Sequence, residues 1–150
     1  DGQATDVVIV PLTDLPNNVK VYPLDLTLST TDIVPEVAMP ISIIGFPLGM
    51  SAAGKFPIWK TGYLASEYDL NYDDKPVCLI DAATRGGMSG SPVVLKMSGG
   101  FKTQDGKNIL ASNVKTRFLG VYSGRIHNDI EVGKVWKPVI IDQIFSHNGL

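Results

Sequence analysis

Along most of the chain, short apolar runs or apolar residues alternating with polar ones are separated by turn residues. The runs are rich in β-branched and aromatic residues and occupy 5–12, 40–46, 56–66, 76–82, 91–97 and 116–124. Clusters of Gly, Pro, Asn and Asp lie between them, which is typical of many short strands joined by turns. Residues 98–113 carry Asp105-Gly106 near their centre and are expected to form a long hairpin or a surface loop.

One segment near the C-terminus has helical spacing. Its apolar positions are Val139, Ile140, Ile144 and Phe145, and Asn148-Gly149 follows as a stop signal. The chain contains no internal repeat and no low-complexity tract. The pattern as a whole predicts an all-β fold, an antiparallel barrel or sandwich with a C-terminal helix.

Composition narrows the class of protein further. The chain has 150 residues, about one domain, and its 44% hydrophobic and 19% charged residues favour a folded globular protein. A net charge of −2 gives no reason to expect nucleic acid or an anionic membrane as a partner. No apolar run approaches the ~20 residues that cross a bilayer. The single cysteine, Cys78, permits no internal disulfide and is expected to be a buried apolar residue.

The candidate chemistry lies in ATRGGMSGSPVV, residues 82–93. Glycines on both sides of Ser89 permit positive φ angles and the close approach of a ligand. If the amides of Gly87 and Ser89 point the same way, they form a pair of donors for a developing oxyanion. A serine hydroxyl, however, is a poor nucleophile without a neighbouring base. The residues alone therefore leave two interpretations open, a nucleophile loop and a flexible surface turn.

The segment GGMSGSP is similar to the nucleophile loop of chymotrypsin-like (trypsin-fold) serine peptidases, usually Gly-x-Ser-Gly-Gly-Pro. Other segments resemble that family in the same order along the chain. Residues 5–12 resemble the segment with the catalytic aspartate, and 44–50 with 59–66 resemble paired segments of the bacterial HtrA-like branch. Residues 119–125 resemble the strand after the nucleophile, and 136–144 resemble the terminal helix. The resemblance thus extends from residue 5 to about residue 146.

The resemblance implies roles for individual residues. Ser89 would be the nucleophile, the backbone N–H groups of Gly87 and Ser89 the oxyanion hole, and Asp6 the acid that orients a histidine. Ser123 would lie near this aspartate. Met88 occupies the position where many members carry an aspartate that pairs with a freed N-terminus, so activation by N-terminal insertion is not expected.

The resemblance also implies a substrate-binding surface. Ser123, Gly124 and Arg125 would offer their backbone to an extended peptide. Ala83 and Thr84 fall where the floor of the S1 pocket is usually formed. Because neither is charged, a small or apolar P1 side chain is expected.

By the same resemblance, 1–12 would be the last strand of the first barrel, 13–38 the interbarrel linker, and 39–150 the second, Greek-key barrel with its terminal helix. In this family the catalytic histidine precedes the aspartate, and the five residues before Asp6 hold none. His127 and His147 are each expected to be solvated loop residues. We therefore expect a serine-type endopeptidase that works through an acyl-enzyme, with this chain alone almost inactive for want of the histidine.

A catalytically dead, protease-like module that binds peptides remains the alternative, and a structural β-barrel is a third. The expected partners are a polypeptide substrate, the missing N-terminal barrel segment and, through an exposed barrel edge, a second copy of the chain. No metal and no cofactor are expected, because no His/Cys cluster has metal-ligand spacing and this chemistry needs neither. A bacterial chain in either the cytoplasm or the periplasm fits the sequence, which contains no recognisable targeting segment.

Overall fold

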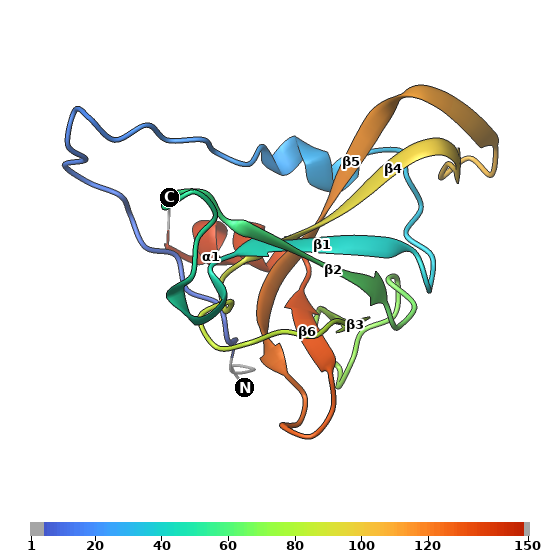
Figure 1. Ribbon diagram of the computed structural model, residues 1–150. Helices are drawn as coiled ribbons and strands as arrows, with labels where there is room; N and C mark the ends of the chain where they lie inside the picture. The colour runs from blue at the N-terminus through green and yellow to red at the C-terminus, as the bar shows by residue number, and fades with distance from the viewer. Residues whose placement is uncertain (1–4, 149–150) are drawn as a thin grey trace.

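The computed structural model describes residues 5–148 and is mostly antiparallel β-sheet with one C-terminal α-helix (Figure 1). This confirms the class of fold that the sequence predicts. The strands are β1 (Pro40–Gly45), β2 (Ile58–Leu64), β3 (Val77–Asp81), β4 (Pro92–Lys102), β5 (Asn108–Arg125) and β6 (Val132–Trp136). Two short 3₁₀ helices, η1 (Leu26–Thr30) and η2 (Pro47–Gly49), and the helix α1 (Val139–Asn148) complete the structure.

The six strands form a closed ring of antiparallel pairs in the order β1-β2-β3-β6-β5-β4. The ring closes because β1 pairs with β2 along one side and with β4 along the other. Strands that follow one another in sequence are therefore not always neighbours, since β3 lies beside β6 and not beside β4. Each strand of the ring satisfies its backbone hydrogen bonds on both sides along at least part of its length.

The core lies inside this ring and is built by alternation. In β1, for example, Ile41 and Ile43 are buried, whereas Ser42 between them is partly exposed. Cys78 of β3 is also completely buried, as expected, and burial raises the pKa of its thiol to about 12. The fully buried large side chains of the core are Ile33, Ile41, Ile43, Leu64, Ile80, Met88, Leu95, Leu119, Val77, Val93, Val94 and Val135.

A second, smaller cluster fixes α1 to the outside of the ring. Ile140 of the helix packs there with Val77 and Trp136, and Val7 from the N-terminal segment is partly buried against the same cluster. The helix is present where it was predicted, but its buried face differs. Ile140, Ile141 and Ile144 face the cluster, whereas Val139 and Phe145 are exposed. Gly149, the predicted stop, lies outside the described residues.

The long hairpin predicted over 98–113 is present as the outer part of β4 and β5, which extend together beyond the ring (Figure 1). Its turn is closed by hydrogen bonds from the Thr103 amide to the Lys107 carbonyl and from the Gly106 amide to the Thr103 carbonyl. Gly106 has a φ of +82°, which a glycine adopts without strain.

Two expectations about strands were wrong. Residues 132–136 form β6 although the sequence analysis did not identify them, and residues 5–12 form no strand. Residues 5–12 alternate like a strand but form no ladder with any strand among residues 5–148. In Figure 1 the segment before η1, in blue, loops away from the ring of strands. No helix in the described part of the chain is long and apolar enough to cross a membrane.

Candidate active site

The glycine-rich loop between β3 and β4 is held from both ends, not free. Met88 is completely buried in the core and anchors the loop, and the Ser91 amide donates to its carbonyl at 3.0 Å. Gly87, just before it, has a φ of +84°, and a Cβ there would lie 2.8 Å from the carbonyl oxygen of Phe46. The loop therefore has a defined shape that depends on glycine at position 87 and on a large apolar side chain at position 88.

Ser89 is at the exposed tip of this loop, directly opposite the end of β5. The Gly90 amide donates to the carbonyl of Tyr122 at 2.8 Å, and the Tyr122 amide donates to the carbonyl of Ser91 at 2.9 Å. The Ser89 hydroxyl lies 3.5 Å from the carbonyl oxygen of Ser123. Within residues 5–148, the amides of Gly90 and Ser91 donate to the main chain, whereas those of Gly87 and Ser89 form no hydrogen bond.

Ser89 and Asp6, which are 83 residues apart in sequence, line the same cavity. The cavity has a volume of about 340 Å³ and lies between the N-terminal segment, the serine loop and the end of β5. Val7, beside Asp6, packs against the α1 cluster and thereby holds the segment against the ring. The lining residues are Thr5, Asp6, Val7, Val8, Ser89, Gly90, Val121, Tyr122 and Ser123.

The hydroxyl of Ser123 is buried in this region and has no hydrogen-bond partner among residues 5–148. A buried hydroxyl without a partner is costly, so an acceptor or a water molecule is expected to meet it when the site is complete. Asp6 lines the same cavity and carries acceptor oxygens only. The structure thus brings together Ser89, Asp6 and Ser123, three of the residues that the sequence singled out.

The two residues expected at the floor of the S1 pocket differ in their surroundings. Ala83 is exposed, whereas Thr84 is buried and its hydroxyl lies 2.5 Å from the Tyr122 hydroxyl. Neither lines the cavity that contains Ser89. Tyr122 does line this cavity. It was not identified from the sequence, although it directly precedes the candidate residue Ser123 in a segment predicted to be a strand.

The remaining residues of the expected substrate-binding edge lie at the end of β5. Gly124 has a φ of +135° and follows an irregularity in the pairing of β5 with β6. The Arg125 guanidinium donates to the carbonyl of Asn128 and lies 3.8 Å from the Glu131 carboxylate. The same carboxylate lies 3.2 Å from the guanidinium of Arg85, in the serine loop. Glu131 therefore links the serine loop to this edge, a role that its sequence context did not reveal.

The two histidines lie outside the serine loop, one between β5 and β6 and the other in α1. His127 is exposed and its Nδ1 lies 3.5 Å from the Asp129 carboxylate. His147 lies in the last turn of α1, not after the helix as expected, and is exposed. Neither residue lines the cavity that Ser89 and Asp6 share. Among residues 5–148, no three His, Cys, Asp or Glu side chains gather as a metal site.

An antiparallel β fold with a C-terminal helix, in which a glycine-rich serine loop opens onto a cavity, fits a trypsin-like fold. Residues 1–100 match the family model described as a trypsin-like peptidase domain. Because the match covers 100 of the 150 residues, the chain belongs to this family. Membership of the family indicates a peptidase. No curated protein and no solved structure matches the chain.

Proposed function

We propose that this chain contributes the nucleophile and the acid of a serine-type endopeptidase. The observation that carries the proposal is the cavity shared by Ser89 and Asp6, on a chain that belongs to a peptidase family. The Ser89 hydroxyl is exposed beside this cavity, where a peptide carbonyl could reach it. The reaction is peptide-bond hydrolysis through an acyl-enzyme formed on Ser89.

Every role in the reaction except that of the base is assigned to a residue of this chain. The Ser89 oxygen attacks the carbonyl carbon of the scissile bond, and a histidine takes its proton. The histidine gives this proton to the leaving amine as the C–N bond breaks, and a water molecule then hydrolyses the ester on Ser89. The amides of Gly87 and Ser89 form the oxyanion hole, for which their lack of other acceptors among the described residues is support. Asp6 would orient the histidine, and the Ser123 hydroxyl, which has no partner among the described residues and lines the same cavity, would donate to the Asp6 carboxylate in the complete site.

The histidine is proposed to come from outside these 150 residues. His127 and His147 are both exposed and line no part of the shared cavity, so neither is placed to deprotonate Ser89. The chain by itself is then nearly inactive, because an unactivated serine is a weak nucleophile. It would need an N-terminal first barrel that carries the histidine.

In this proposal residues 39–150 are the second barrel and 13–38 the interbarrel linker. The strand order β1-β2-β3-β6-β5-β4 fits a Greek-key arrangement, since β4 returns to pair with β1. An extended peptide would pair with the main chain at Ser123, Gly124 and Arg125. The uncharged Ala83 and Thr84 favour a small or apolar P1 side chain. The protein would belong to the bacterial HtrA-like branch, and the support for this is the sequence resemblance of segments 44–50 and 59–66, which lie at β1 to η2 and along β2.

A peptide-binding module without turnover is the second candidate. It is favoured because no histidine among residues 5–148 lines the cavity of Ser89, and a groove can bind a peptide without a base. The two candidates differ in the reactivity of Ser89 and not in peptide binding.

Labelling with a fluorophosphonate probe separates them. The probe is applied to this chain and to a longer form of the protein that includes N-terminal sequence, each beside its Ser89→Ala variant. We expect labelling of the longer form only, and its loss in Ser89→Ala. Ser91→Ala is a matched control, since Ser91 is buried two residues away and should not change labelling. Labelling of neither form would exclude the peptidase and leave the binding module.

A further inference from the structure

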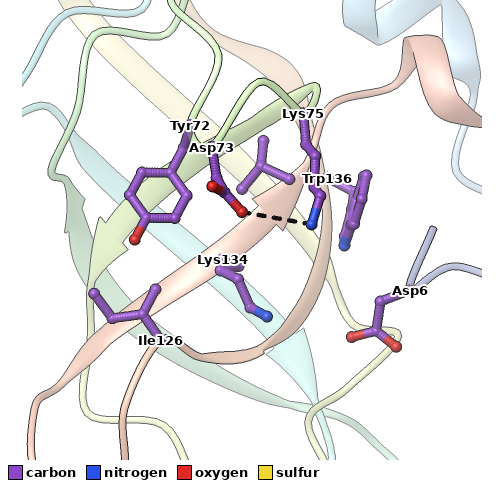
Figure 2. A pocket seen from close by; sticks show the side chains of 8 residues that line it. Asp6, Tyr72, Asp73, Lys75, Ile126, Lys134 and Trp136 are labelled. Atoms are coloured by element: carbon purple, nitrogen blue, oxygen red, sulfur yellow. Dashed lines mark ion pairs between the residues drawn. The ribbon is translucent and has the colours of Figure 1, made fainter. Parts of the chain in front are cut away.

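Besides the Ser89 hydroxyl, the proposed mechanism needs a carboxylate without a competing cation and an amide that faces the substrate oxygen. Asp6 meets the first need. It borders a cavity beside β3 and β6 in which Lys75 pairs with Asp73 at 3.5 Å, and among residues 5–148 no cation forms an ion pair with Asp6 (Figure 2). The Gly87 amide meets the second need only if its peptide is held in one orientation, because a peptide between two glycines rotates easily.

A short turn after β1 holds this peptide from one side. The turn is the 3₁₀ helix η2 (Pro47–Gly49), and the amide of Leu48 in it donates a hydrogen bond to the Gly86 carbonyl at 2.7 Å. The turn also lies against Gly87, since a Cβ there would be 2.8 Å from the Phe46 carbonyl oxygen and 3.3 Å from the Leu48 nitrogen. Both residues of the Gly86–Gly87 peptide therefore contact the same turn.

The hydrogen bond to the Gly86 carbonyl also fixes the direction of the Gly87 amide. In a trans peptide the C=O and N–H groups lie in one plane and point in opposite directions, and the described residues contain no cis peptide. Because the Gly86 carbonyl points at the Leu48 amide, the Gly87 N–H points away from the turn. This N–H has no acceptor among residues 5–148, which leaves it free for a substrate oxygen.

Leu48 makes this contact in a backbone conformation that leucine does not favour. Its φ is +53° and its ψ is +27°, in the left-handed region where most residues with a side chain are strained. Its side chain is 68% exposed, so apolar packing does not explain the conformation. The neighbours hold the turn instead, since Pro47 is buried and the Gly49 amide donates to the Phe46 carbonyl at 2.9 Å. Backbone strain of this kind concentrates at functional sites.

We propose that Leu48 is a positioning residue for the oxyanion hole. Its left-handed backbone aims its amide at the Gly86 carbonyl and thereby holds the Gly87 N–H toward the oxyanion. The inference rests on the proposed peptidase function, in which the Gly87 amide stabilises the charge that develops on the substrate oxygen. Rotation of the Gly86–Gly87 peptide would break the Leu48 hydrogen bond and turn the Gly87 N–H out of the hole.

Two substitutions of Leu48 separate the role of its backbone from that of its side chain. Asparagine enters the left-handed region readily but is polar, whereas valine is apolar but β-branched and disfavours that region. In the longer form of the protein, we expect Leu48→Val to lower kcat for peptide hydrolysis about tenfold or more and to change KM by less than about twofold, because the oxyanion hole acts on the transition state. Leu48→Asn should keep both constants within about twofold of the unaltered protein.

Ala53→Val is the matched control. Ala53 also has a positive φ, of +47°, and is exposed in the same connection between β1 and β2, but no hydrogen bond among residues 5–148 joins it to the serine loop. This variant should leave kcat unchanged. If Leu48 acted through apolar contacts of its side chain, Leu48→Asn would be more damaging than Leu48→Val. That order, or equal kcat values for all the variants, would overturn the proposal.

The orientation of the Gly87 amide is measured separately on the 150-residue chain, which does not have to be active. The residual dipolar coupling of the Gly87 N–H, fitted together with those of the strand amides, should agree with the structure in the unaltered chain and in Leu48→Asn and should deviate in Leu48→Val. The same spectra show whether each variant is folded.

The two measurements distinguish a failure of this inference from a failure of the proposed function. If the longer form hydrolyses no peptide, the peptidase is refuted, and the coupling still decides whether Leu48 fixes the Gly87 amide. If hydrolysis proceeds but the Gly87 coupling or kcat is the same in Leu48→Val as in the unaltered protein, the positioning role alone is refuted.

Discussion

At the scale of single residues, the serine loop combines a feature that the sequence reveals with one that it hides. The glycines around Ser89 predicted a turn with positive φ angles, and Gly87 and Gly90 have them, at +84° and +85°. Their pattern also suggested a flexible loop. The complete burial of Met88 contradicts that, since its side chain fills a place in the core between strands distant in sequence. No local pattern distinguishes a methionine that anchors a loop from one that merely lies in it.

Replacement of Gly87 by alanine tests how far this loop shape depends on glycine. A Cβ would lie 2.8 Å from the Phe46 carbonyl oxygen, and a φ of +84° strains any residue with a side chain. We expect Gly87→Ala to lower the free energy of unfolding by about 1–3 kcal/mol, measured by urea denaturation. Gly86→Ala is the matched control, because a methyl group at position 86 would meet no atom within 4 Å and should cost far less. Equal losses for both would contradict the assigned role of Gly87.

At the scale of elements, a strand was predicted correctly where a strand-like sequence pattern also has a neighbouring strand to pair with. The runs at 40–46, 76–82 and 91–97 became β1, β3 and the first part of β4 within a few residues. β6 was missed because it has five residues and contains Gly133 and Lys134, so its alternation is weak. Residues 5–12 show the reverse, a strand-like pattern that no neighbouring strand completes.

Only the part of the candidate site that is contiguous in sequence could be predicted. The serine loop is contiguous in sequence, so Ser89 and its glycines could be recognised from local spacing alone. Glu131 contacts both Arg85 and Arg125, and Tyr122 contacts Thr84, only because the fold brings separate segments together. Contacts of this kind depend on which strands become neighbours, and one sequence does not specify that.

Arg117 of β5 joins the base of the protruding hairpin to the segment before β1. It is about nine-tenths buried, its guanidinium donates to the carbonyls of Ile33 and Thr31, and it lies 5.4 Å from the centre of the Tyr68 ring. We expect Arg117→Met, which keeps the apolar stem, to lower the free energy of unfolding by about 1.5–3 kcal/mol, because two carbonyls lose a charged donor. Amide exchange at Val34, which donates to Lys102, should become faster.

Lys115→Met serves as the control for this prediction, because Lys115 lies two residues away on the same strand and is exposed. It should change neither the stability nor the exchange at Val34. An Arg117→Met variant as stable as the unaltered chain would mean that the cost of burying the charge cancels the gain from its hydrogen bonds.

At the scale of the whole molecule, apolar surface is distributed unevenly. The ring buries its inward-facing side chains, yet the segment that leads away from the candidate site exposes Val8 to 83% and Val10 and Leu12 each to 71%. Soluble monomers rarely leave a row of large apolar side chains in water. These three residues alternate along one extended stretch, so they can all face a single partner. Asp6 lies two residues before this row and Val8 itself lines the Ser89 cavity, so a partner that covers the row would also border that cavity.

For the chain by itself, the partner available in solution is a second copy, and we expect concentration-dependent self-association through this row. Sedimentation velocity over a wide range of concentration should show a dimer whose association constant falls by about tenfold or more in the triple variant Val8→Ser, Val10→Ser, Leu12→Ser, because apolar burial drives the contact. Leu110→Ser is the control, since Leu110 is 85% exposed but lies on the protruding hairpin and should have no effect. A clean monomer at every concentration, or a dimer that only Leu110→Ser weakens, would contradict a contact at this row. Loss of the dimer on addition of an N-terminal segment of the kind that the proposed function requires would indicate that both partners cover the same residues, and therefore that the row is part of the surface that completes the proposed active site.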